Sequence, residues 1–297
     1  MRILLVVATL LLAGCTSGSG EDERLTVGGG PSSESQILQA LYAKLLSRAG
    51  FQVEAGSRGD RETYLRLLRE GTLDVVPEYA ATLTEYLNHE LNGDRAATAS
   101  THDVGQTVAA LRELADDRGL GVLDPAEAAS QNGFAVSKAL ADEHDLTTLS
   151  DLAALQRPVT LAASAQCARR PLCRPGLERV YGLSFAALLP TGYGSAATKQ
   201  AVVSGKADLA LVGTTDGAVA GFGLVLLADD RGLQPADNLV PVVNERSAGG
   251  EKVAAALRPL AGVLTTERLA ALNAQVDGGR RDPEDVAQDF LEAADLL

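Results

Sequence analysis

The chain of 297 residues carries a formal net charge of −13, and 46% of its residues are hydrophobic. This length and composition suit one large globular domain or two lobes of moderate size. The acidic balance, without a cluster of lysine and arginine, argues against nucleic acid or an anionic lipid surface as a partner.

The first 23 residues have the pattern of a targeting segment followed by a tether. Arg2 precedes an apolar run over residues 3–13, which is shorter than the roughly 20 residues that span a bilayer. Small residues before Cys15 form a lipobox, so residues 1–14 are a predicted lipoprotein signal peptide, with lipidation of Cys15 after cleavage. An ordinary signal peptide is the alternative. Residues 15–23, rich in serine, glycine and acidic side chains, are the predicted tether.

The next part of the chain alternates between strand and helix signals. An apolar strand runs into a glycine turn, and a serine-capped helix follows, with Gln36 three residues after Ser33. The order β-α-β-α-β predicts a mostly parallel sheet. The five signals fall at residues 25–30, 32–50, 51–57, 60–71 and 73–76.

Further helices and strands are expected through the rest of the chain. Pro283 after Asp282 marks the start of the last helix. Helices are predicted at 101–119, 147–155, 251–264, 265–276 and 282–297, and apolar strands at 133–136, 159–164, 209–213, 222–230 and 239–243.

Two stretches far apart in the sequence share one layout. Residues 64–79 and 198–216 each contain an amphipathic helix, a glycine, an aspartate and an apolar strand that ends in polar residues. This repeated pattern predicts two similar α/β lobes. Ligands of open α/β sheets bind beyond the carboxyl ends of the strands. Tyr79 is therefore a candidate ligand contact on one lobe, and Thr214, Thr215 and Asp216 are candidates on the other.

Two cysteines remain after the lipobox. Cys167 and Cys173 lie close together, and export would place them in an oxidising compartment, so a local disulfide is predicted. A zinc site would need further ligands, and no histidine is close in sequence, so no metal is expected. Because the loop that it closes is short, the disulfide would add little stability through chain entropy. Its expected role is to fix the shape of that loop.

Several of these segments together resemble one family. These segments are similar to the substrate-binding proteins of osmoprotectant ABC importers, of the ProX/OpuC type: the lipobox and residues 27–38, 71–83, 147–155, 205–217, 224–243 and 282–291. The resemblance covers nearly the whole mature chain.

The resemblance implies a two-lobed periplasmic-binding-protein clamshell (type II), whose chain crosses between the lobes twice. Lobe one would comprise residues 24–129 and 214–297, and lobe two residues 130–213. Such a protein closes over glycine betaine, choline, carnitine or a related small molecule such as proline. It delivers that ligand to an ABC permease as a monomer, without a cofactor, while anchored outside the cytoplasm.

A quaternary ammonium group offers no conventional N–H donor, so aromatic faces recognise it through cation–π attraction. The family places rings, mostly tyrosines, at four motif positions. The resemblance assigns the first position to Tyr79 and the others to Asn132, Lys199 and Gly213. Because three rings are replaced, an alternative is a non-quaternary polar or aromatic ligand, sugar-like or polyphenolic. A lysine here would repel a quaternary cation unless a carboxylate offset its charge.

The remaining predicted contacts come from loops. Tyr193 or Phe134 would replace missing rings from neighbouring positions. Arg170 matches the family's arginine that pairs with a ligand carboxylate, and a solvated basic loop is its alternative. Ser32 and Ser33 are expected at the cleft, where helix capping is a compatible role.

Other function classes have little support in the sequence. The chain contains neither H-E-x-x-H nor G-x-S-x-G, so we predict that it is not an enzyme. A lipoprotein that senses a ligand without importing it remains an alternative, since it would use the same clamshell.

Overall fold

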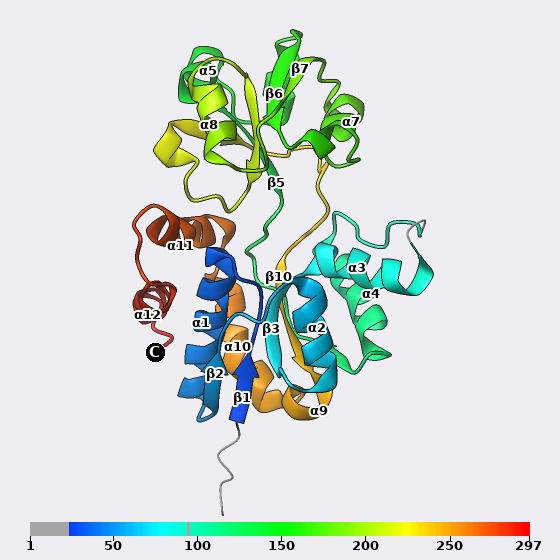
Figure 1. Ribbon diagram of the computed structural model, residues 1–297, viewed down its shortest axis with the longest axis vertical. Coiled ribbons are helices and arrows are strands. Elements are labelled where there is room, and N and C mark those ends of the chain that lie inside the picture. The colour runs from blue at the N-terminus through cyan, green and yellow to red at the C-terminus, as the bar shows by residue number, and fades with distance from the viewer. Residues whose placement is uncertain (1–23, 94–95) are drawn as a thin grey trace, which may run out of the picture.

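The computed structural model describes residues 24–93 and 96–297, which form two lobes, each built around a five-stranded sheet (Figure 1). The predicted two-lobed α/β architecture is thereby confirmed. The predicted signal peptide, the lipidated Cys15 and the tether lie outside the described residues. Within the described ranges, no helix combines the length and the apolar character needed to cross a membrane.

The sheet of lobe one is mixed. Its strand order is β2-β1-β3-β10-β4. Strand β1 runs parallel to both of its neighbours, β2 and β3, whereas β10 runs antiparallel to β3 and β4. The predicted β-α-β-α-β run thus forms parallel strands, and β10 is the antiparallel strand, placed between β3 and the edge strand β4. The strands are β1 (Arg24–Val27), β2 (Gln52–Ala55), β3 (Val75–Tyr79), β4 (Leu120–Val122) and β10 (Leu239–Asn244).

The sheet of lobe two repeats this plan. Its order is β7-β6-β8-β5-β9, with β6 parallel to β7 and β8, and β5 antiparallel to β8 and β9. Each strand of one sheet thus has a counterpart at the same place in the other. The strands are β5 (Asn132–Ser137), β6 (Val159–Ala163), β7 (Phe185–Pro190), β8 (Leu209–Gly213) and β9 (Leu224–Leu227).

The sequence pattern shared by residues 64–79 and 198–216 corresponds to one repeated hydrogen-bond pattern. Asp74, just before β3, accepts from the backbone N–H of Thr26 at 2.7 Å and donates its own N–H to the carbonyl of Thr26 at 2.9 Å. Asp208, just before β8, makes the same two bonds with Thr160, at 2.7 and 2.9 Å. In both lobes the aspartate therefore fixes the register of the central strand against its parallel neighbour, β3 against β1 and β8 against β6.

Two segments connect the lobes (Figure 1). One joins β4 to β5, the other joins β9 to β10, and they pair with each other at Ala129 and Asn238. The expected boundary at residue 213 needs correction, because β9 lies beyond it and pairs with β5 in the second sheet. By sheet membership, lobe two continues to β9 and the chain re-enters lobe one at β10.

Helices cover both faces of the lobe-one sheet (Figure 1). One core contains the buried faces of α1 and α10–α12, and another contains those of α2–α4. Ser32 caps α1 by accepting from the N–H of Ser35, whereas Gln36 donates to the carbonyl of Pro31, so the expected capping pair is displaced. The helices are α1 (Ser33–Arg48), α2 (Arg61–Glu70), α3 (Ala80–Asn92), α4 (Val104–Asp116), α9 (Glu245–Ala248), α10 (Glu251–Val263), α11 (Thr266–Asp277) and α12 (Pro283–Ala293).

Lobe two has shorter helices, and its buried side chains also form two cores. Thr148 and Asp151 form a capping box at the start of α6, as the predicted helix start there requires. The helices are α5 (Lys138–His144), α6 (Leu149–Ala154), α7 (Arg174–Gly176) and α8 (Ala196–Val203), with single turns at Ala165–Ala168, Leu177–Tyr181 and Ala220–Phe222.

Candidate functional site

The carboxyl ends of β3 and β8 both lie against the segments that connect the lobes. The N–H of Ala80, just after β3, donates to the carbonyl of Asn238 at 2.8 Å. The N–H of Thr214, just after β8, donates to the carbonyl of Gln131 at 3.0 Å. The residues that follow these two strands therefore gather between the lobes, where the sequence predicts a ligand.

Tyr79, the last residue of β3, contacts a carboxylate in lobe one. Its hydroxyl donates to Glu34 in the first turn of α1, and the second oxygen of Glu34 accepts from the side-chain amide of Asn273 at 2.6 Å. Burial raises the pKa of Tyr79 well above its usual value, and Glu34 adds to this rise. Tyr79 is thus a neutral ring held in a fixed orientation.

Glu78, the residue before Tyr79, belongs to a buried ionic cluster with Arg61 and Tyr64. Glu78 is 1% exposed and accepts two bonds from Arg61 at 2.9 and 3.1 Å. It also accepts from the hydroxyl of Tyr64 at 2.6 Å and from the backbone N–H of Tyr79 at 3.0 Å. Its role here is to hold the end of β3 in place.

A second carboxylate lies in the returning connection. Asp237 is buried and accepts from the N–H and the hydroxyl of Thr82 at 2.9 and 2.5 Å. Burial raises the pKa of Asp237, because a charged carboxylate is poorly solvated there. It lies close enough to Tyr79 to contribute to the raised pKa of that hydroxyl.

In lobe two, Lys199 is neutralised by a carboxylate. Its Nζ lies 2.6 Å from Asp216 and donates to the carbonyl of Gly194 at 2.6 Å. Its charge also lies 5.7 Å from the centre of the Phe222 ring. The repulsion expected between Lys199 and a bound cation is therefore offset by its own ion pair.

Tyr193 lies beside the end of β8. Its side chain is 52% exposed, and its hydroxyl would lie 3.3 Å from a Cβ atom placed on Gly213. Burial raises the pKa of Tyr193 to about 12, and the negative charges of Glu34, Asp216 and Asp237 add to this rise. Phe134, the other ring considered, is 1% exposed within the lobe-two core and does not reach the site.

Three residues that were predicted to contact the ligand form hydrogen bonds to the segments that connect the lobes. They are Thr214, Thr215 and Asn132. Thr214 accepts from the N–H of Gln131 and donates to the carbonyl of Ala129, both within 3.2 Å. The hydroxyls of Thr215 and Ser130 lie 3.0 Å apart. Asn132 donates to the side-chain oxygen of Gln234 at 3.2 Å.

Two further predicted contacts stand at the edge of the site. Ser32 is exposed and serves as the cap of α1, and Ser33 is half-buried as its first residue. Both precede Glu34, so they border the region around Tyr79.

The predicted disulfide between Cys167 and Cys173 is present, and both residues are buried. Within its loop, the carbonyl of Leu172 accepts from Gln234 at 2.9 Å, which ties the loop to the returning connection. Arg170 is exposed on this loop.

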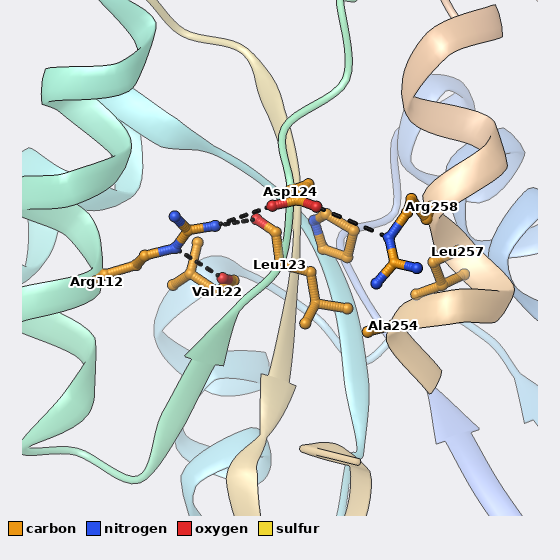
Figure 2. A pocket seen from close by; sticks show the side chains of 8 residues that line it. Arg112, Val122, Leu123, Asp124, Ala254, Leu257 and Arg258 are labelled. Carbon is orange, nitrogen blue, oxygen red and sulfur yellow. Dashed lines mark hydrogen bonds and ion pairs between the residues drawn. The ribbon is translucent and has the colours of Figure 1, made fainter. Parts of the chain in front are cut away.

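The cavity between α4 and α10 does not compete as a candidate site. The pocket between α4 and α10, of about 150 Å³, is shown in Figure 2. Arg112 donates there to the carbonyl of Val122 and to Asp124, and Arg258 pairs with Asp124 and Glu251. These charges already have partners. In residues 24–93 and 96–297, no group of histidine, cysteine and acidic side chains is arranged to hold a metal ion.

The sequence reading missed Glu34, Asp237 and Asn273. Glu34 directly follows the serine pair that was expected at the cleft, so its place after the glycine turn could have drawn attention to it. Asp237 precedes an apolar strand, as Asp74 and Asp208 do. Asn273 lies within an ordinary helical pattern and gave no signal.

Comparisons with known proteins agree with this architecture. A family model for the substrate-binding domain of ABC-type glycine betaine transport systems matches residues 23–293. A glycine-betaine-binding protein of Pseudomonas aeruginosa is 30% identical over 292 residues, covering 95% of this chain and 91% of the relative. The glycine betaine-binding protein YehZ of Escherichia coli K12 is 28% identical over 277 residues, covering 90% and 89%.

Solved structures confirm the clamshell fold. The structure of apo YehZ from Escherichia coli matches with a TM-score of 0.80 and 27% identity, covering 92% of this chain and 99% of the other. Lactococcal OpuAC, in its closed form with glycine betaine, matches with a TM-score of 0.53 and 14% identity, covering 92% and 97%.

Proposed function

Because this chain belongs to the family of substrate-binding domains of ABC-type glycine betaine transport systems, and is therefore a binding protein and not an enzyme, we propose that it captures one small quaternary amine between its lobes. It holds the ligand outside the cytoplasm and delivers it to a membrane permease. The lipobox before Cys15 supports an anchor in the cell membrane for this receptor.

The observation that carries the proposal is the pair of tyrosines beside the connections. Tyr79 ends a strand of lobe one, and Tyr193 lies beside the end of β8 in lobe two. Glu34 and Asp237 act electrostatically on both hydroxyls. Aromatic faces next to carboxylates attract a cation that has no hydrogen to donate. Tyr193 thus supplies a ring where Gly213 has none.

The polar alternative loses support from the same contacts. It relied on Asn132 and Lys199 as donors to the ligand. Asn132 already donates to Gln234, and Lys199 is paired with Asp216. A quaternary amine is therefore the favoured ligand class.

Capture follows from the connections between the lobes. In the described part of the chain only two segments join the two sheets, so a rotation about these segments changes the distance between Tyr79 and Tyr193. A ligand that touches both rings binds the closed form better than the open form, and it shifts the population toward closure by that difference.

The proposed function is tested by a thermal-shift screen followed by calorimetry. The mature chain is mixed with choline, glycine betaine, carnitine, proline, sugars and phenolic compounds. A quaternary amine is expected to raise the melting temperature, because it binds only the folded state. A response to sugars or phenolics alone would contradict the proposal.

The variant Tyr79→Ala is expected to weaken binding of the best quaternary amine by about 1–3 kcal/mol, the range for losing a cation–π contact and an aromatic surface. Tyr79→Phe keeps the ring and should retain most of the affinity. Tyr86→Ala is the control, since Tyr86 lies on α3 and packs on the core of lobe one. Isothermal titration calorimetry measures all three. Equal affinity of Tyr79→Ala and the parent chain would remove Tyr79 from the site.

A further inference from the structure

The charges around the two tyrosines do not balance. Lys199 is paired with Asp216 in lobe two, and Arg61 is paired with Glu78 behind Tyr79. Within the described part of the chain, the hydrogen-bond partners of the Glu34 and Asp237 side chains are the neutral groups of Tyr79, Asn273 and Thr82. The two carboxylates at the site therefore lack a paired cation of their own.

Glu34 is held in place by a residue that contacts both lobes. Asn273 on α11 is 4% exposed. Its amide nitrogen donates to Glu34 at 2.6 Å and to the carbonyl of Thr215, beyond β8, at 2.9 Å. Gly217 packs against the backbone of Ala274 on the same helix. The Glu34 carboxylate is thus fixed where α11 meets the loop that follows β8.

The amide oxygen of Asn273 is buried, and among the described residues no donor satisfies it. The nitrogen of Asn273 must face Glu34 and the Thr215 carbonyl, because both of these are acceptors. The side chain consequently places an unsatisfied acceptor next to an uncompensated carboxylate. Both features disfavour an anionic group and favour a cation or a donor.

We propose that Glu34 makes this receptor select an amine with net positive charge, such as choline, over a zwitterion such as glycine betaine. The proposal rests on the function inferred above and names the charge class of its ligand. A net cation supplies the missing counter-charge. A zwitterion brings its own carboxylate into a closed site where Glu34 repels it, and this repulsion is stronger than in water because the local dielectric is low.

The test compares choline with glycine betaine by calorimetry, for the mature parent chain and for Glu34→Gln. The parent chain is expected to bind choline at least about tenfold more tightly than glycine betaine. In Glu34→Gln this ratio should fall by about tenfold or more, since choline loses a counter-charge and glycine betaine loses a repulsion. Glu113→Gln is the matched control: Glu113 is exposed on α4, and its replacement changes the net charge by the same amount.

The possible failures are distinguishable. If the parent chain binds neither amine, the proposed function and the charge assignment both fall. If it binds glycine betaine as tightly as choline or more tightly, only the charge assignment falls, and this comparison requires no variant to fold. If Glu34→Gln keeps the parental ratio while its circular dichroism and melting temperature match those of Glu113→Gln, Glu34 does not set the preference.

Discussion

The variant Glu78→Gln is expected to lower the free energy of unfolding by about 3 kcal/mol, the lower end of the range for breaking a buried ion pair. Glu78 accepts from Arg61, from Tyr64 and from the N–H of Tyr79. Glutamine removes the charge that Arg61 is paired with and leaves fewer acceptor sites for three donors. The Arg61 side chain is 29% exposed, so it recovers some hydration, which is why the lower end applies.

Urea denaturation followed by circular dichroism measures this loss. The matched control is Glu54→Gln, which breaks the exposed pair between Glu54 and Arg58, where the Glu54 side chain is 77% exposed. A surface pair of this kind is worth up to about 1 kcal/mol. Equal losses for the two variants would mean that the buried cluster adds no more than a surface pair.

Glu78→Gln should also weaken binding of a quaternary amine. The carboxylate accepts from the backbone N–H of Tyr79, so its loss frees the residue that carries the ring. This second effect separates a positioning role from a purely structural one. Calorimetry at a temperature where the variant remains folded is the measurement.

The fold was largely readable from local patterns because its strands are short apolar runs between capped helices. The pattern shared by residues 64–79 and 198–216 had a physical cause, since Asp74 bonds to Thr26 in the same way as Asp208 bonds to Thr160. The pairing of the strands could be predicted less well from the sequence. An apolar run was expected around β9, but its place beside β5 depends on tertiary contacts that the local sequence does not encode. Strands β4 and β7 were missed, and each lies at the edge of its sheet, where one side of the strand has no partner strand.

The candidate site was only partly readable, for a similar reason. Tyr79 stands at a strand end, where α/β sheets bind ligands, and the sequence marks that place. The partners that define its surroundings come from distant segments. Asn273 bonds to Glu34 across 239 positions of the chain, and no local pattern links these two residues. The pairing of Lys199 with Asp216 likewise depends on how α8 packs beside the loop after β8.

The variant Lys199→Met is also expected to lower the free energy of unfolding by about 3 kcal/mol, because it leaves a carboxylate and a carbonyl without their partner. The side chains of Lys199 and Asp216 are only 6% and 16% exposed. Methionine fills a similar volume, so the loss reports mainly on charge. The double variant Lys199→Met with Asp216→Asn removes the stranded charge and should recover at least half of the loss, which a double-mutant cycle measures.

Lys138→Met is the control for this cycle, since Lys138 and Asp142 form an exposed pair whose side chains are 67% and 62% exposed. Its replacement should cost less than about 1 kcal/mol. The ion pair also borders the proposed ligand site, because Lys199 donates to the carbonyl of Gly194, the residue that follows Tyr193. Lys199→Met therefore leaves Asp216 as a third carboxylate without a paired cation near the Tyr193 ring. It also removes the bond to Gly194 that holds the loop carrying Tyr193. If the single variant is as stable as the parent chain, Asp216 does not depend on Lys199 for compensation, and the account of a neutral pair in lobe two fails.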